Sequence, residues 1–200
     1  IDQGLDPLGG LSVPIGLVAG AALPGPALAI DVASAAGGAA GLMAYVATGT
    51  HGLAVVDAAR VTSPEVLGTL DLEGDNRDVA VDGARGLAAV TGGTAGLHVV
   101  DVSDPTRPVL LRTVGLAGAA NTVVVRDGFA YVATSGDVTV VDLLTGAVGE
   151  TTDLGGGLVV DLALDGEVLY ALDAGGTVRA LDLAESGLSL LGSVTFAVSS

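Results

Sequence analysis

The stretch that decides the fold is GLHVVDVSDPTRPVLLRTVGL, which spans residues 96–116. It contains a short apolar strand that ends at Asp101, a Ser-Asp-Pro turn, and a second apolar strand that starts after Pro108. Short polar side chains hydrogen-bond the local backbone and proline fixes φ, so Ser, Asp and Pro together favour a turn. The stretch therefore predicts two strands joined by a tight connection.

Copies of this pattern recur along the chain. An apolar strand that ends in aspartate occurs four times at spacings of 44, 41 and 40 residues, at Asp57, Asp101, Asp142 and Asp182. We expect these aspartates to be structural, with side chains that accept hydrogen bonds from the turn backbone that follows. Asp-Gly pairs, which suit two-residue hairpin turns because both positions tolerate positive φ, occupy a second turn in three periods, at residues 82–83, 127–128 and 165–166.

Each period thus predicts four short strands. Four antiparallel strands repeated about every 40 residues are typical of a β-propeller blade. The composition agrees, because half of the residues are hydrophobic, 32 are glycine and only five are aromatic. A four-stranded sheet cannot bury both faces alone, so the blades must stack. We predict an all-β fold, a β-propeller of four-stranded antiparallel blades.

The N-terminus resembles the end of a blade. Ile1-Asp2, Asp6-Pro7 and the apolar run Ile15 to Ala22 parallel the third strand, turn and fourth strand of the central stretch. We therefore expect one domain of about four blades plus one N-terminal outer strand, divided as 1–26 (end of a preceding blade), 27–74, 75–118, 119–155 and 156–200.

The last blade has its own outer strand, expected from Leu188 to Val198, so the N-terminal strand is not needed to complete it. This favours a segment of a larger propeller of roughly six to eight blades. The rival is a closed ring of four or five blades with an extra edge strand. The run Ala35–Gly41 is expected to be a Gly/Ala insertion after the first inner strand.

The motifs resemble a known family. The stretch at residues 96–116 looks like the LVIVD-type repeat of bacterial β-propellers, and YVATSGDVTVVDLLTG at residues 131–146 is similar to the related YVTN-type repeat. The resemblance implies a propeller of exported or surface-associated bacterial proteins, in which the repeats serve binding or scaffolding.

Charge and composition exclude some partners. The chain carries 23 acidic against 7 basic residues, all of the latter arginine, for a net charge of −16. Such a surface repels phosphate backbones and anionic lipid, which argues against nucleic acid and membrane attachment. The uncharged run at residues 10–30 contains three prolines and fits the repeat, so no membrane span is expected. No cysteine is present, which excludes disulfides and thiolate metal sites.

The candidate binding residues are Asp78, Asn121 and Asp161, which stand at or near the start of inner strands. Inner strands line the central channel of a propeller, and polar groups at its rim are where ligands commonly bind. The alternative is that these groups cap strand ends and hydrate the channel.

Calcium is the one cofactor for which the sequence offers ligands. The loop DLEGDNRD contains four carboxylates, Asp71, Glu73, Asp75 and Asp78, and Ca²⁺ takes six to eight oxygen ligands. The spacing matches no standard calcium loop, and Arg77 competes for the carboxylates. A solvated acidic loop is the favoured interpretation, and a calcium site at these four carboxylates is the alternative.

Two functions stay open. The first is a non-catalytic LVIVD-like module that binds or scaffolds an unknown protein or glycan partner, packed against neighbouring blades of the same chain, outside a bacterial cell. The second is part of a propeller enzyme, such as a quinoprotein-like dehydrogenase or lactonase-like hydrolase, with a site at the channel. The histidines, His51 and His98, stand at near-equivalent repeat positions and form no recognised catalytic motif. We favour the first function and predict no catalytic residue.

Overall fold

The computed structural model describes residues 20–34, 41–60, 62–184 and 187–196. These residues form sixteen β-strands and, within the described ranges, no α-helix. Most of the expected N-terminal outer strand and nearly all of the Ala35–Gly41 insertion lie outside the described residues.

The first two blades each contain four strands in chain order from the inside outward. The strands of the first blade are β1 (Ala29–Ser34), β2 (Leu42–Ala47), β3 (Leu53–Asp57) and β4 (Glu65–Leu70). Those of the second are β5 (Val79–Asp82), β6 (Leu87–Thr91), β7 (Leu97–Asp101) and β8 (Val109–Val114). The stretch at residues 96–116 therefore supplies β7, its turn and β8, as its pattern predicts.

The other two blades repeat this order. The third blade contains β9 (Ala120–Arg126), β10 (Phe129–Thr134), β11 (Asp137–Asp142) and β12 (Val148–Asp153). The fourth contains β13 (Val159–Asp165), β14 (Val168–Asp173), β15 (Thr177–Ala184) and β16 (Gly187–Thr195). All pairings are antiparallel, so the prediction of four-stranded antiparallel blades is confirmed. The predicted outer strand of the last blade is present as β16, which ends three residues before the expected Val198.

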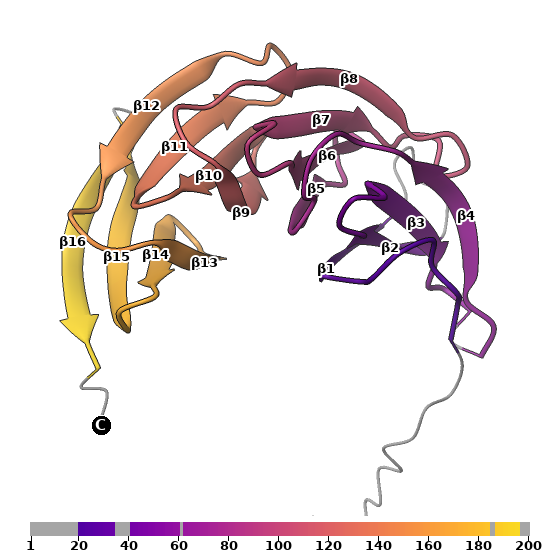
Figure 1. The fold of residues 1–200 in the computed structure, drawn as a ribbon, viewed down its shortest axis with the longest axis horizontal. Coiled ribbons are helices and arrows are strands. Elements are labelled where there is room, and N and C mark those ends of the chain that lie inside the picture. The colour runs from indigo at the N-terminus through magenta and orange to yellow at the C-terminus, as the bar shows by residue number, and fades with distance from the viewer. Residues whose placement is uncertain (1–19, 35–40, 61, 185–186, 197–200) are drawn as a thin grey trace, which may run out of the picture.

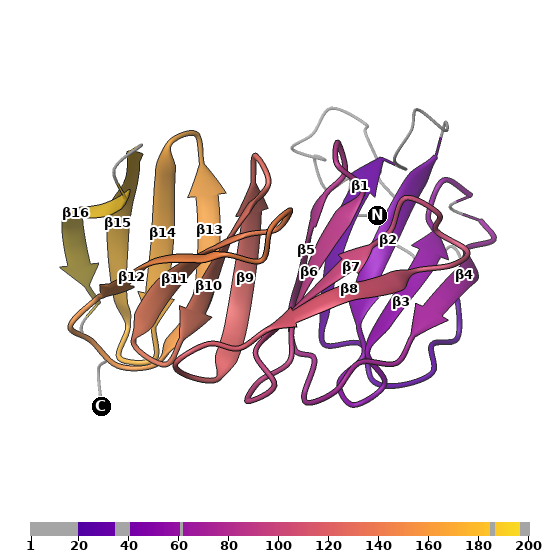
Figure 2. The ribbon, with the colours of Figure 1, turned by 90° about the horizontal axis from the view of Figure 1, so that it is seen from above.

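The four blades follow one another around an open arc (Figure 1). The inner strands β1, β5, β9 and β13 lie on its concave side, and the outer strands β4, β8, β12 and β16 lie on its convex side. Figure 2 shows the successive sheets standing side by side along the arc. Consecutive inner strands contact one another, which gives the concave side a continuous wall.

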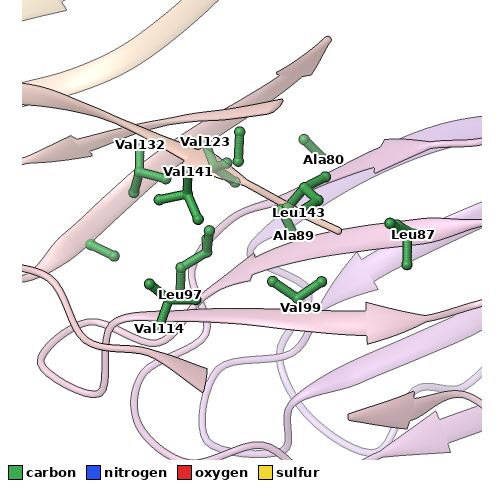
Figure 3. Packing of buried hydrophobic residues seen from close by; sticks show 12 residues of the cluster. Ala80, Leu87, Ala89, Leu97, Val99, Val114, Val123, Val132, Val141 and Leu143 are labelled. Atoms are coloured by element: carbon green, nitrogen blue, oxygen red, sulfur yellow. The ribbon is translucent and has the colours of Figure 1, made fainter. Parts of the chain in front are cut away.

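The core lies between blades. The interface of the second and third blades buries Leu97 and Val99 of β7 in one cluster with Val132 and Val141, whose side chains are labelled in Figure 3. Equivalent clusters lie between the first and second blades and between the third and fourth. Burial of each Val or Leu side chain contributes roughly 1.5–3 kcal/mol to the free energy of folding. Stacking of small branched side chains therefore stabilises the array of blades without large aromatic residues.

In three blades the third strand ends at an aspartate, as expected. Asp57, Asp101 and Asp142 each accept a hydrogen bond at Oδ1 from the backbone N–H two residues later, at 2.8–3.0 Å. The prediction is wrong for Asp182, because β15 does not end there but continues to Ala184. Asp182 is therefore a strand residue that pairs with Val168, and no turn directly follows it.

The Asp-Gly turns differ among the blades. Only Asp127-Gly128 has positive φ at both residues, 51° and 86°, as a tight two-residue hairpin requires. In the second blade the strands are joined by a longer turn, in which Asp82 accepts hydrogen bonds from the Arg85 backbone and guanidinium at 3.1 and 2.7 Å. The positive φ there falls on Gly86 instead of Gly83.

Candidate ligand-binding site at the channel mouth

The three predicted rim residues lie around one hollow on the concave side of the arc. This hollow has a volume of about 380 Å³ and is lined by Asp78, Asn121 and Asp161 together with Arg77 and Thr122. Its apolar wall contains Leu28, Ala29, Leu158, Val159 and Val160. Residues from all four blades thus meet at one place, because the four inner strands begin along the same rim of the concave side.

The Asp78 carboxylate is held between two blades. Its Oδ1 accepts the N–H of Val79 at 2.9 Å, and its Oδ2 accepts the Val123 N–H at 2.9 Å and the Thr122 hydroxyl at 2.6 Å. Burial raises the pKa of Asp78 above its ordinary value, although the hydrogen bonds from Thr122, Val123 and Val79 oppose the rise. The side chain therefore joins the second and third blades while it lines the hollow.

Asp31 on β1 forms the same kind of bond one interface earlier, and the sequence interpretation missed it. Its Oδ1 accepts the Val32 N–H, and its Oδ2 accepts the Val81 N–H of the next inner strand, both at 2.7 Å. Asp31 also lines a second hollow of about 330 Å³ farther along the concave side, together with Asp78 and Asp161. The feature of the sequence that could have indicated this role is an aspartate within the apolar run AIDVAS.

Asp161 and Asn121 have fewer partners than Asp78. Asp161 is exposed, and its Oδ1 accepts the N–H of Leu162 at 2.9 Å. Asn121 is half-buried, and no hydrogen bond of its side chain is found within the described part of the chain. These two side chains are therefore the rim groups with the most capacity for an external partner.

The four acidic residues of the loop before β5 do not converge on one point. Arg77 donates to Asp75 at 2.6 Å, as expected from its position, and Asp78 is directed to the third blade. Among the described residues no group of three His, Asp or Glu side chains is placed to hold a metal ion. Asp71 and Glu73 are exposed.

Asn76 organises this loop, a role that the sequence did not indicate. It is fully buried, and its Nδ2 donates to the carbonyls of Gly49 at 2.8 Å and Leu72 at 3.1 Å. Backbone bonds between Gly49 and Asn76 reinforce the link at 3.0 and 3.2 Å. The loop before β5 is therefore fixed to the β2–β3 turn of the first blade.

The histidines have structural surroundings. His98 is buried, and its ring nitrogens lie 2.9 Å from the Thr113 hydroxyl and 2.8 Å from the Glu73 carbonyl oxygen. His51 lies in the β2–β3 turn and packs against Gly25. Neither histidine lines the two hollows of the concave side.

Four radially arranged, four-stranded antiparallel sheets with inner strands along a common wall define a β-propeller domain. Sequence comparison identifies the family within this class of fold. The profile described as the LVIVD repeat matches residues 39–71, 73–115 and 117–143, just over half of the chain. The chain belongs to the LVIVD repeat family, and the prediction of an LVIVD-type propeller is confirmed. The matched segments cover β2 to β11 and thus most of the first three blades.

Solved structures share the fold at low sequence identity. Hydrazine synthase of Kuenenia stuttgartiensis aligns with a TM-score of 0.68 and 19% identity, over 86% of this chain and 49% of that one. The computationally designed Ika4 protein aligns with a TM-score of 0.64 and 12% identity, over 82% of this chain and 94% of that one. The designed Ika8 protein aligns with a TM-score of 0.61 and 15% identity, over 82% of this chain and 48% of that one.

The chain therefore spans about half the length of two of these structures, and nearly the full length of Ika4. A comparison with curated proteins found no match. Within the described residues no helix is long and apolar enough to cross a membrane.

Proposed function

We propose that the chain is a non-catalytic LVIVD-repeat propeller module that binds a protein or glycan partner at the mouth of its concave side. The observation that carries this proposal is the hollow in which Asp78, Asn121 and Asp161 meet. Its polar groups are an amide, a guanidinium and carboxylates, which pair with hydroxyls, amides and basic groups.

The wall of the hollow supports a partner with apolar as well as polar surface. Leu28 and Leu158 are each 49% exposed and Val160 is 45% exposed, and all three line the hollow beside the polar groups. Ligand sites in proteins commonly combine apolar walls with a few convergent polar groups. A sugar ring or a peptide side chain offers both kinds of contact.

The charge of the chain suits an exported or surface-associated bacterial protein, which is the setting we propose. A net charge of −16 keeps a β-rich module soluble and discourages association through sheet edges. The chain contains no cysteine, so its folding is independent of the redox state outside the cell.

Binding of two probe sets tests the proposal. The 200-residue chain is applied to an array of neutral and basic oligosaccharides and to an array of arginine- and lysine-containing peptides. We expect binding on one of the arrays, weakened at least several-fold by Asn121→Ala and by Asp161→Asn. The first array identifies a glycan partner and the second a protein partner.

Asp165→Asn is the matched control for Asp161→Asn. Asp165 is exposed and stands at the other end of β13, so the charge change is the same while the hollow is untouched. The proposal fails if neither array binds the chain, or if Asp165→Asn weakens binding as much as Asp161→Asn.

A further inference from the structure

The larger hollow of the concave side, of about 380 Å³, is lined by the extra residues of two β-bulges. The register of β9 on β10 shifts between Ala133 and Thr134, and Asn121 has no pairing partner there. Val160 is unpaired in the same way where β13 pairs with β14. In the first two blades the inner strand pairs with the second strand without a register shift. Because a bulge redirects the side chain of its extra residue, the third and fourth blades each bring one additional side chain to this hollow.

Bonds from the second blade hold the backbone on both sides of Asn121. The N–H of Ala120 donates to the Gly93 carbonyl at 2.9 Å, and the Thr122 hydroxyl donates to Asp78 at 2.6 Å. Asn121 stands between these two anchored residues. Its position is therefore fixed by the fold, and little conformational entropy is lost there when a ligand binds.

The backbone beside Val160 is held in a similar way. The N–H of Val159 donates to the Ser135 carbonyl of the third blade at 2.7 Å, and the Leu158 carbonyl accepts the N–H of Ala174 at 2.8 Å. Each bulge thus follows a residue that is bonded to the preceding blade. The hollow is a preformed site, which is the usual state of ligand sites in proteins.

The polar groups of the hollow are complementary to a peptide unit and to a basic group. Asn121 offers an N–H₂ donor and an oxygen acceptor side by side, and a peptide unit presents a C=O and an N–H to match them. Asp161 accepts the Leu162 N–H at Oδ1, and within the described residues its Oδ2 has no hydrogen bond. Arg77 is paired with Asp75 at 2.6 Å. The exposed Asp161 carboxylate is therefore the group that attracts a lysine or arginine.

The apolar wall of the hollow is aliphatic, and its half-exposed members are Leu28, Leu158 and Val160. No aromatic residue lines either hollow of the concave side within the described part of the chain. Branched aliphatic side chains interdigitate well with other branched side chains. The flat C–H face of a sugar ring is matched best by an aromatic ring, whose face carries negative charge density. The wall therefore favours an aliphatic side chain of a peptide over a sugar ring.

The two hollows adjoin, because Asp78 and Asp161 line both. The second hollow, of about 330 Å³, is also lined by Ile30 of β1 and Leu164 of β13. Together the hollows form an elongated groove along the inner strands. An extended peptide, whose successive side chains point to opposite sides, fits a groove of this shape with every second side chain against the wall.

We infer that this groove binds an extended peptide segment of a protein partner, in which an aliphatic residue lies next to a lysine or arginine. The Asn121 amide pairs with one peptide unit, and Asp161 Oδ2 accepts a hydrogen bond from the basic group. Val160 and Leu158 contact the aliphatic side chain. The inference rests on the proposed function, because it names the class of partner for the same site and excludes a glycan.

Peptides of defined sequence test the inference on the 200-residue chain. Peptides blocked by an acetyl and an amide group carry leucine beside lysine. Matched peptides replace the leucine by alanine, or the lysine by its uncharged analogue norleucine. We expect the leucine–lysine peptides to bind at least several-fold more tightly than both matched sets, as measured by titration calorimetry.

N-methylation of single peptide bonds identifies the unit that pairs with Asn121, because it removes one N–H donor. At one position it should weaken binding to the wild-type chain at least several-fold. The same methylation should cause no further loss in Asn121→Ala, since both changes remove one interaction. The urea midpoint of Asn121→Ala, expected close to that of the wild type, checks that the variant is folded.

Two further variants separate the other contacts. Val160→Ala should weaken binding of the leucine–lysine peptides at least several-fold and of the alanine–lysine peptides little. Val148→Ala is the matched control, because Val148 is 49% exposed on β12 at the convex side, and it should weaken neither. Asp161→Asn should abolish the preference for lysine over norleucine, whereas Asp165→Asn should keep it.

Binding of oligosaccharides but not of these peptides would overturn the inference and leave the proposed function in place. Equal losses on N-methylation in the wild-type chain and in Asn121→Ala at every position would also overturn it, as would equal effects of Val160→Ala and Val148→Ala. Absence of binding to both kinds of probe would overturn the proposed function together with the inference.

Discussion

The Asp78 carboxylate accepts the backbone N–H of Val123 at 2.9 Å, across the interface between the second and third blades. The Thr122 hydroxyl donates to the same oxygen at 2.6 Å. One side chain thus connects two inner strands that are separated by 45 residues in sequence. This bond sets the position of one inner strand along the next, while hydrophobic contacts supply most of the free energy of packing.

Asp78→Ala should lower the free energy of unfolding by about 2 kcal/mol, because the Val123 N–H and Thr122 hydroxyl lose their acceptor in a half-buried setting. Urea denaturation followed by circular dichroism measures the change. Asp161→Ala is the control, since Asp161 bonds only its own strand within the described residues. Equal losses for the two variants would contradict the interblade role of Asp78.

Acidification should stabilise the wild-type chain relative to Asp78→Asn. The pKa of Asp78 is raised in the folded state above its ordinary value of 3.8, chiefly by burial. As the pH falls from the raised pKa towards 3.8, the folded chain binds a proton that the unfolded chain does not, which favours folding. Urea denaturation of both proteins across this pH range measures the difference. A relative loss of wild-type stability on acidification would show that the pKa is lowered instead.

Asn76→Ala should destabilise the chain by about 2 kcal/mol, because the buried Gly49 and Leu72 carbonyls lose a side-chain donor. Amide exchange of the β2–β3 turn should also become faster, since the loop before β5 no longer holds it. Asn121→Ala, at a half-buried asparagine, should change the unfolding free energy little. Unchanged exchange at Gly49 would show that the backbone bonds alone hold the turn.

Arg179→Ala should lower the urea midpoint more than Arg77→Ala does. Arg179 donates to Asp173 at 2.8 Å, and both side chains are largely buried, whereas the Arg77–Asp75 pair is exposed. The hydrogen bond from Arg179 is the main cause of the lowered pKa of Asp173, so that pKa should rise in the variant.

In the wild-type chain, ionised Asp173 therefore stabilises the folded state at pH values above the ordinary pKa of aspartate. This stabilisation is lost as the pH falls through the lowered pKa of Asp173. Arg179→Ala should lose less stability over that range. Carboxyl-carbon NMR of Asp173 measures the pKa directly, and an unchanged value would contradict this account.

Gly96→Ala should destabilise the chain by about 2 kcal/mol or more, because Gly96 has a φ of 98° and an added Cβ would collide with the Val114 carbonyl oxygen. Gly115→Ala, where nothing lies within 4 Å of an added Cβ, should cost roughly 0.5 kcal/mol or less. Thermal unfolding of both variants provides the comparison. Similar midpoints would show that the β6–β7 turn adapts to a side chain at residue 96.

The strands of the chain could be predicted because their signals are local. Apolar strands recur in all four periods, while the Asp-Gly pair and the aspartate that ends the third strand each recur in three, and together they predicted the strands of each blade, including β16. The prediction failed at Asp182 for a local reason as well. Its strand continues for two residues, so the aspartate that resembled a turn residue is paired within the sheet.

The site could be predicted only in part. That Asp78, Asn121 and Asp161 stand near the starts of inner strands followed from the repeat, and a propeller brings such positions together. Asp31 and Asn76 were missed because their roles depend on groups 50 and 27 residues away in sequence. No periodic pattern encodes a bond between one side chain and a distant backbone group.

The sequence by itself determined the repeat, the strand order within a blade and the small apolar side chains that make stacking favourable, because each depends on residues near one another in the chain. Only the tertiary structure decided that Asp31 and Asp78 bridge neighbouring blades and that Asn76 fixes the loop before β5 to the β2–β3 turn. These features depend on how sheets stack, and stacking is set by contacts among side chains from different blades.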